Sequence, residues 1–305
     1  MRVLVTGGAG YLGSVLCGRL LEEGHGVTVL DSMRHGTPSL LHLCADLRLD
    51  IVRGDCRDGR ALRPLLASCD AVVPLAAVVG AAACDRDATA AWTTNLEAVR
   101  LLLSLRGRGQ ALVFPATNSG YGTGGAEPCT EDSPLRPLSL YGRSKVAAEE
   151  AALEAGNSVS LRLATLFGAS PRMRRDLLVN HLVYLAATQG YAVVYEPGFR
   201  RNFVHVRDVA DCVAWCLGSW DRVAGRPYNL GNDRANLTKE GLALKVKEHF
   251  PDFDVRIGEG RADPDRRDYV VSSERLRRAG FEARRGLDEG IRELAVAYRM
   301  EEGAR

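Results

Sequence analysis

Residues 3–13 of the 305-residue chain read Val3-Leu4-Val5-Thr6-Gly7-Gly8-Ala9-Gly10-Tyr11-Leu12-Gly13, and they give the clearest indication of its fold class. An apolar run leads into a glycine-rich turn, and apolar residues then recur at helical spacing from Leu12 to Glu23. A second apolar run, Val27 to Leu30, follows. We therefore predict a strand, a helix and a second strand, which together form the opening βαβ unit of a parallel sheet.

The same alternation continues along the chain. Strand-like runs occur at 50–53, 71–74, 112–115 and 159–163, and segments with helical periodicity lie between them, as at 93–105 and 144–155. This pattern predicts an α/β fold, a Rossmann doubly wound parallel sheet with a smaller C-terminal substrate-binding domain. We assign residues 1–168 and about 203–230 to the dinucleotide-binding domain, and about 169–202 and 231–305 to the smaller domain.

Composition excludes several classes of protein. Hydrophobic residues make up 46% of the chain and charged residues 26%, which excludes disordered and fibrous proteins. The net charge of +2 gives no reason to expect nucleic acid or an anionic membrane as a partner. The most apolar stretch, residues 71–84, is too short to cross a bilayer, and from the short apolar run at residues 3–5 we expect no secretory signal. We expect a cytoplasmic protein, and the spacing of its cysteines and histidines predicts no metal site.

The glycine-rich turn has the spacing G-x-x-G-x-x-G, which suits a dinucleotide. Such glycines bring backbone N–H groups and a helix N-terminus against a pyrophosphate, although a turn without a ligand has the same pattern. Asp31 ends the second strand, where a carboxylate accepts hydrogen bonds from a ribose and repels a 2′-phosphate. NAD is therefore expected rather than NADP. The nearby Arg34 favours NADP instead, because a cation can accommodate the 2′-phosphate. The expected cofactor contacts here are Gly7, Gly10, Tyr11, Leu12, Gly13 and Asp31.

Asp55 and Cys56 follow the third predicted strand. From this position an acidic side chain can reach the amino group of an adenine, so both residues are predicted cofactor contacts. The alternative for Asp55 is a loop carboxylate or a helix cap.

Tyr141 and Lys145 stand four residues apart at the start of a predicted helix, so both side chains can lie on one face. A phenol is a poor base at neutral pH, but a neighbouring ammonium and a bound nicotinamide cation both favour phenolate. Tyr141 can then take a proton from a substrate alcohol while hydride leaves the same carbon.

Over essentially its whole length the chain resembles the extended short-chain dehydrogenase/reductases, the family of nucleotide-sugar epimerases and dehydratases. The glycine loop, Asp31, Leu75-Ala76-Ala77, Asn95, Tyr141 and Lys145 match this family in order and spacing. The resemblance implies that Leu75, Ala76, Ala77, Asn95, Tyr141 and Lys145 contact NAD, and that Thr117 joins Tyr141 and Lys145 as a third catalytic residue. It also implies a homodimer, formed through the helices after Thr93 and after Tyr141.

The resemblance places further residues against a nucleoside-diphosphate sugar. Arg201 matches the arginine on the phosphate side, although Asn202 replaces the more usual aspartate, and Arg267 matches a second such arginine. For both, a solvated or salt-bridged surface residue is the alternative. The segments 117–122, 163–165, 170–174 and 263–269 look like those of enzymes that oxidise or epimerise C4 of nucleotide-activated heptoses. The further substrate contacts expected from this are Arg172, Arg174 and Asn180.

The two residues after Thr117 bear on the reaction. Related 4,6-dehydratases carry a carboxyl residue there for acid and base chemistry, whereas this chain has Asn118 and Ser119, which cannot exchange a proton near neutral pH. We expect both to contact the substrate. The favoured function is an NAD-dependent 4-epimerase acting on a nucleotide-activated heptose. A 4-dehydrogenase that releases the ketone is the alternative, ahead of a 4,6-dehydratase or a non-catalytic dinucleotide-binding protein.

Overall fold

The computed structural model describes residues 1–125, 127–260 and 267–302. Most of the segment 263–269, which carries part of the resemblance to heptose enzymes, lies outside these ranges.

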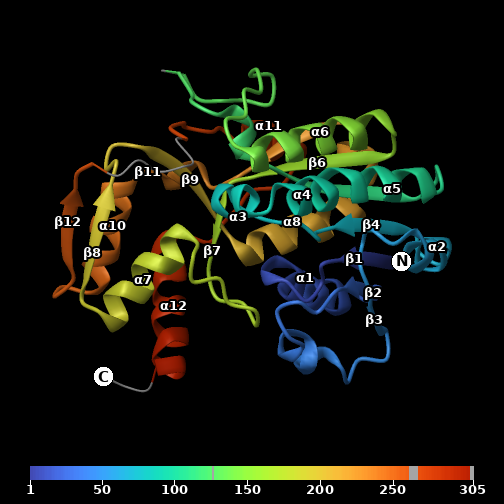
Figure 1. The fold of residues 1–305 in the computed structure, drawn as a ribbon, viewed down its shortest axis with the longest axis horizontal. Helices are drawn as coiled ribbons and strands as arrows, with labels where there is room; N and C mark the ends of the chain where they lie inside the picture. Colours follow the sequence, from blue (N-terminus) through green and yellow to red (C-terminus); the bar gives the residue numbers. More distant parts are fainter. Residues whose placement is uncertain (126, 261–266, 303–305) are drawn as a thin grey trace.

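A seven-stranded sheet forms the core of the larger part of the molecule, on the right in Figure 1. Its spatial order is β10-β6-β5-β4-β1-β2-β3, and every pair of neighbours is parallel. Reversal of the strand order beside β1 is the mark of the doubly wound fold, so the predicted fold class is confirmed. The strands are β1 (Arg2–Thr6), β2 (Gly26–Asp31), β3 (Leu49–Arg53), β4 (Ala71–Pro74), β5 (Ala111–Thr117), β6 (Ser158–Leu163) and β10 (Pro227–Leu230).

Helices cover both faces of this sheet because its central strands are apolar on both sides. Every residue of β4 and of β5 is buried. On one face lie α1 (Tyr11–Glu22) and α8 (Val206–Gly218), which pack against each other. On the other lie α2 (Gly59–Ala67), α5 (Ala98–Leu105) and α6 (Leu140–Glu154).

The C-terminal half contributes a second core beside the carboxyl ends of the strands. Figure 1 shows this part on the left, with a two-stranded sheet at the outer edge and α7 (Leu178–Thr188), α10 (Lys239–His249) and α12 (Leu287–Glu302) on its inner side. That sheet pairs β8 (Tyr191–Tyr195) with β12 (Asp254–Gly258) in parallel. A three-stranded sheet of β7 (Thr165–Phe167), β9 (Arg200–His205) and β11 (Asn236–Thr238) lies between the two halves.

Short elements complete the described chain. They are η1 (Pro38–Leu43), α3 (Ala81–Arg86), α4 (Ala88–Trp92), η2 (Thr93–Glu97), η3 (Asn118–Tyr121), α9 (Trp220–Val223), η4 (Asp233–Ala235) and α11 (Glu274–Ala279).

The helix predicted over 93–105 begins as a π-helical turn, η2, and becomes regular only in α5. Within η2 the Asn95 side chain reaches out to the loop after β4, where it accepts a hydrogen bond from the Val78 N–H at 2.8 Å. π-Turns are often found at functional sites.

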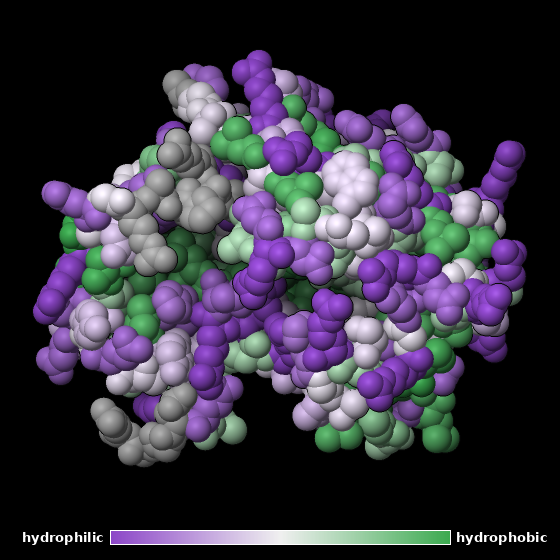
Figure 2. Space-filling view, viewed as in Figure 1, coloured by the Kyte–Doolittle hydropathy of each residue, from purple (hydrophilic) through white to green (hydrophobic). Residues whose placement is uncertain are grey.

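The face in Figure 2 is predominantly hydrophilic, with hydrophobic side chains in small groups. Among the described residues no helix is long and apolar enough to span a membrane. The described part of the chain also holds no cluster of side chains suited to a metal ion, and its eight cysteines are unpaired.

Candidate active site

A cavity of about 1190 Å³ opens at the carboxyl ends of the parallel strands, between the main sheet and the C-terminal half. Strands β1, β2 and β4 end at it, which is where ligands bind in open α/β sheets. Its volume exceeds the usual range for one small ligand, so a dinucleotide and a second molecule can share it. The predicted site residues that line it are Gly7, Gly10, Tyr11, Leu12, Gly13, Asp31, Asp55, Cys56, Leu75, Ala76, Ala77, Thr117, Tyr141, Lys145, Arg172, Arg174, Arg201 and Arg267.

The glycine loop is packed too tightly to accept side chains. Gly7 has φ of 75°, and a Cβ there would lie 2.6 Å from the backbone nitrogen of Ala76. A Cβ on Gly13 would lie 2.4 Å from the Gly7 carbonyl oxygen. Helix α1 begins at the edge of the cavity after Gly10, without a side-chain cap, so its first N–H groups are not taken up by a capping side chain. The loop therefore presents donors of the kind that bind a pyrophosphate.

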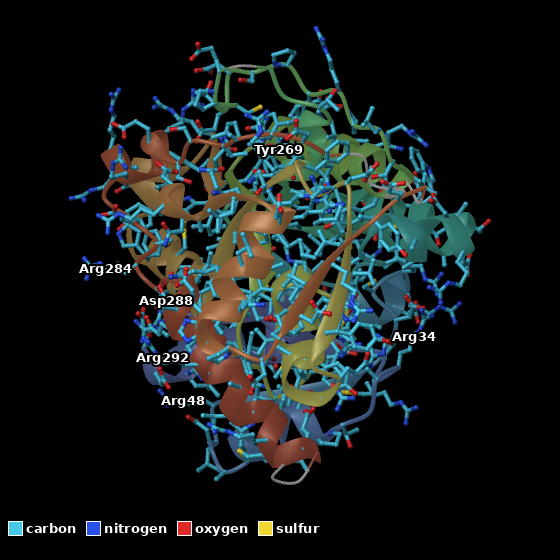
Figure 3. The ribbon with its side chains drawn as sticks, turned by 90° about the vertical axis from the view of Figure 1, so that its left-hand side faces the viewer. Arg34, Arg48, Tyr269, Arg284, Asp288 and Arg292 are labelled. Atoms are coloured by element: carbon cyan, nitrogen blue, oxygen red, sulfur yellow. The ribbon has the colours of Figure 1, made fainter. Side chains whose placement is uncertain are left out.

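Asp31 is held in place by the loop itself. Its two carboxylate oxygens accept hydrogen bonds from the N–H of Ala9 at 3.0 Å and of Met33 at 2.8 Å. The exposed Arg34 also lines the cavity, and Figure 3 shows it on the side of the molecule opposite Arg284 and Arg292. A carboxylate fixed at the end of β2 suits a ribose diol.

Asp55 is paired with Arg57, whose guanidinium binds its carboxylate at 2.6 Å and lowers the pKa of that carboxyl. The same arginine reaches the Thr93 hydroxyl at 3.3 Å, linking the loop after β3 to η2. Helix α2 is capped by Asp58 instead, so Asp55 is not the cap of that helix. Burial raises the pKa of the neighbouring Cys56 thiol to about 11, which keeps it neutral.

Asn95 does not line the cavity but fixes one of its walls. Its buried amide donates to the Val78 carbonyl at 2.9 Å and to the Ser144 hydroxyl at 3.2 Å. One side chain thus joins the loop after β4 to helix α6, which carries Tyr141 and Lys145.

The hydroxyl groups of Thr117 and Tyr141 meet at the end of β5. A hydrogen bond between the two side chains opposes burial, which raises the pKa of the Tyr141 phenol above its ordinary value. The positive charges of Arg267 and Arg174 act in the same direction as Thr117 and favour phenolate. Thr117 also donates to Ser119 at 3.1 Å, and Ser119 accepts from Arg267 at 2.7 Å.

Lys145 lies one helical turn beyond Tyr141, and only 4% of it is exposed. Burial lowers the pKa of its ammonium to about 8, while the charge of Glu149 acts against that shift. Its Nζ lies 4.3 Å from the centre of the Phe114 ring, a cation–π contact on β5. Lys145 therefore loses its charge within a pH range that experiments can reach.

The segment after β7 brings Arg172 and Arg174 to the cavity. Arg174 is paired with Asp176, its Nε lying 2.8 Å from the carboxylate. Asn180 does not line the cavity; its amide accepts from the Gly168 N–H at 3.1 Å and donates to the Arg174 carbonyl at 3.0 Å. It braces the segment that carries the two arginines.

That segment is also joined to the cofactor loop. The Tyr11 hydroxyl donates to the Gly168 carbonyl at 2.6 Å, and the Ser170 hydroxyl donates to the Tyr11 carbonyl at 2.7 Å. The first turn of α1 and the arginine-bearing segment therefore form one connected wall.

Asn118 is 1% exposed, and neither its amide oxygen nor its amide nitrogen has a hydrogen-bond partner among the described residues. Neither Asn118 nor Ser119 is among the residues that line the cavity. A buried amide with both functions unpaired is costly, so the position of Asn118 is unfavourable for stability in the structure as it stands.

The predicted site residues do not include those that α7, β8 and α10 contribute to the wall of the cavity. His181, Val193, Tyr195 and Lys239 line the cavity there. The 3.6-residue period of α7 indicates a helix but not which of its faces meets a ligand.

The residues fit NAD. The glycine loop, where any added Cβ would clash, and the first turn of α1 suit a pyrophosphate. The fixed carboxylate of Asp31 suits a ribose. Thr117, Tyr141 and Lys145 lie in the same cavity.

Comparisons with known proteins agree with this geometry. The model of the NAD dependent epimerase/dehydratase family matches residues 3–231. A UDP-glucose 4-epimerase of Corynebacterium glutamicum is 31% identical over 266 residues, covering 80% of this chain and 79% of the relative. UDP-glucose 4-epimerase 2 of Arabidopsis thaliana is 26% identical and covers 96% of this chain and 93% of its own.

Two solved structures show the same fold. The UDP-glucose 4-epimerase of Thermus thermophilus in complex with NAD has a TM-score of 0.85 at 27% identity, covering 98% of this chain and 99% of that one. DesIV, the dTDP-glucose 4,6-dehydratase of Streptomyces venezuelae with NAD and TYD bound, has a TM-score of 0.83 at 27% identity, covering 99% and 98%. The chain belongs to the NAD dependent epimerase/dehydratase family and is an NAD-dependent enzyme.

Proposed function

We propose that the protein is an NAD-dependent 4-epimerase of a nucleoside-diphosphate sugar, which it oxidises to a transient 4-keto sugar and reduces on the other face. Thr117, Tyr141 and Lys145 are its catalytic residues, and the proposed reaction uses no metal ion.

The observation that carries the proposal is that Thr117, Tyr141 and Lys145 line one cavity, while the two residues after Thr117 have no carboxyl group. Asn118 and Ser119 follow Thr117 in η3, and the Ser119 hydroxyl already accepts from Arg267. Expelling water from a sugar needs an acid and a base beside the ring, and neither side chain supplies one. Oxidation and reduction at C4 need only the phenol and the cofactor.

Tyr141 is suited to move the proton of the C4 hydroxyl. Its phenolate is favoured by Thr117 and by the charges of Arg267 and Arg174. NAD, when bound, supplies the hydride acceptor and donor. Thr117 holds the reacting oxygen, and Lys145 keeps a positive charge near the phenol.

For the substrate, the UDP-glucose 4-epimerases among the relatives support a nucleoside diphosphate linked to a sugar. Arg172, Arg174 and Arg201, which line the cavity, are the proposed partners of the diphosphate. The heptose remains a proposal that rests on the resemblance of segments such as 170–174.

The test is a mass measurement on purified enzyme with catalytic amounts of NAD. UDP-, ADP-, GDP-, CDP- and dTDP-linked hexoses and heptoses are each incubated, and the products are separated and weighed. We expect an isomer of unchanged mass and no accumulation of NADH.

Other products contradict the proposal. A ketone two mass units lighter with stoichiometric NADH would show a 4-dehydrogenase, and loss of 18 mass units would show a dehydratase. Failure of every sugar, while calorimetry shows NAD bound, would favour a non-catalytic role. Conversion of hexoses but not heptoses would contradict the heptose as substrate and would leave the proposed 4-epimerase activity in place.

A further inference from the structure

We infer that Glu149, held by Arg162, is a positioning residue that keeps Lys145 charged and ties the helix of Tyr141 to the turn of Thr117. The inference rests on the role proposed above for Lys145.

Glu149 lies one helical turn beyond Lys145 on α6, so the two side chains are neighbours on one face. Both are buried, with exposed fractions of 2% and 4%. In a setting shielded from water, a carboxylate at this spacing strongly favours the protonated amine. The effect of Glu149 on the pKa of Lys145 has this direction.

Arg162 of β6 fixes the Glu149 carboxylate. Its Nε lies 2.9 Å from one carboxylate oxygen and 3.3 Å from the other. The same guanidinium donates from Nη1 to the Tyr121 hydroxyl at 3.0 Å and to the Glu131 carbonyl at 3.1 Å. Tyr121 is the last residue of η3, the turn that Thr117 caps. The pair thus joins α6, which carries Tyr141 and Lys145, to η3, the turn that Thr117 caps.

The pair is not needed merely to neutralise a buried charge. Replacing a buried ion pair by apolar residues is often neutral or stabilising, so such a pair is weak support for a purely structural role. The pair of Glu149 and Arg162 lies one helical turn from Lys145 and contacts the last residue of η3.

Few other charges reach Lys145 from the elements packed on α6. Burial raises the pKa values of Cys84 on α3 and Tyr121 on η3 to about 11 and about 12, so both stay neutral near pH 8. Tyr141 is the phenol that Lys145 serves. The remaining charged side chains of the neighbouring elements and of α6 itself are exposed to water: Asp85, Arg86, Glu97, Arg100, Arg143, Glu150 and Glu154.

The chain offers a direct test because it contains only four lysines, Lys145, Lys239, Lys245 and Lys247. Lysine labelled with ¹³C at Cε gives one signal for each, and Lys145→Arg identifies the signal of Lys145 by its loss. The pH titration of that signal needs no substrate, so a wrong assignment of the reaction would leave it unaffected.

Glu149→Gln keeps the shape of the side chain and removes its charge. We expect the Lys145 midpoint to fall by about one pH unit, since one stabilising opposite charge is lost. In Glu149→Met/Arg162→Met the pair is replaced as a whole; the midpoint falls below that of wild type, but by less than in Glu149→Gln. An unchanged midpoint in either folded variant overturns the inference, and the double variant carries the test if Glu149→Gln does not fold.

Asp208→Asn is the matched control. Asp208 of α8 is 3% exposed and paired with Arg285 at 2.6 Å, and neither lines the cavity. This variant also removes the charge of a buried carboxylate that is paired with an arginine, but it should leave the Lys145 midpoint unchanged. An equal shift would show a general effect of weakened packing and overturn the inference.

Activity gives a second readout once a substrate is found. In Glu149→Gln the alkaline limb of the kcat profile should move to lower pH in parallel with the Lys145 midpoint. A uniform loss of kcat at every pH, with the limb in place, would show a structural role only.

Discussion

The phenol of Tyr141 has neighbours with opposite effects on its proton. Burial raises its pKa, whereas the hydrogen bond with Thr117 and the charges of Arg267 and Arg174 lower it. Catalytic acids and bases work best when their surroundings bring the pKa towards the working pH. Burial is the largest of these effects, so the pKa of the phenol lies above its ordinary value.

Tyr141→Phe removes the proposed acid–base group while leaving the ring in place. We expect kcat to fall by roughly two to four orders of magnitude, the usual size of a general acid–base contribution. NAD binding, measured by calorimetry, should stay nearly unchanged, because the glycine loop and Asp31 are untouched.

Tyr228→Phe provides the control for a lost tyrosine hydroxyl. Tyr228 is buried on β10, away from the cavity, and donates to the Arg222 carbonyl at 3.3 Å. It should retain wild-type kcat. Wild-type kcat in Tyr141→Phe would show that another group moves the proton.

At the scale of elements, the start of α1 depends on the absence of one side chain. Gly13→Ala places a Cβ 2.4 Å from the Gly7 carbonyl oxygen and 2.7 Å from the Gly8 Cα, both backbone atoms that cannot turn aside. We expect a loss of about 1–3 kcal/mol of stability from this overpacking. NAD affinity should fall roughly tenfold or more as the loop shifts, measured by calorimetry.

Gly18→Ala is the matched control on the same helix. Its Cβ would meet only the Leu43 side chain, at an ordinary 3.5 Å. Alanine is the better helix former, so this variant should be as stable as wild type or more stable and should bind NAD equally well. Equal NAD affinity in Gly13→Ala and Gly18→Ala would show that the close packing of the glycine loop is not needed to bind NAD.

The elements of the main sheet could be predicted closely, because each strand and helix carries its own periodicity. The predicted strand 71–74 coincides with β4, and 159–163 differs from β6 by one residue. The pairing of β8 with β12 could not be predicted, since about sixty residues separate them and no turn connects them.

The same limit applies to the site. The spacing of Tyr141 and Lys145 indicates a functional pair because both lie on one helix. The contact of Arg267 with Ser119 joins residues 148 positions apart, and no local pattern encodes it. Glu149, four residues after Lys145, could have been noticed from the same helical spacing.

At the scale of the whole molecule, we predict a homodimer formed through α5 and α6. These helices lie side by side on one face of the sheet, and Trp92, just before them, is 40% exposed. Light scattering at micromolar concentration should give twice the 33.0 kDa of one chain. A mass of one chain at that concentration would contradict the prediction.

The hydrogen bonds from Tyr11 to Gly168 and from Ser170 to Tyr11 bear on how long a cofactor stays bound. The first turn of α1, where a pyrophosphate would rest, cannot separate from the segment leading to Arg172 without breaking both. Opening a path for the dinucleotide to leave would therefore also move Arg172, which we propose as a partner of the diphosphate of the sugar. A catalyst that gives its electrons back to the molecule they came from loses nothing by such slow exchange, because one resident cofactor serves many turnovers. An enzyme that must exchange its cofactor in every cycle would be slowed by the same two hydrogen bonds.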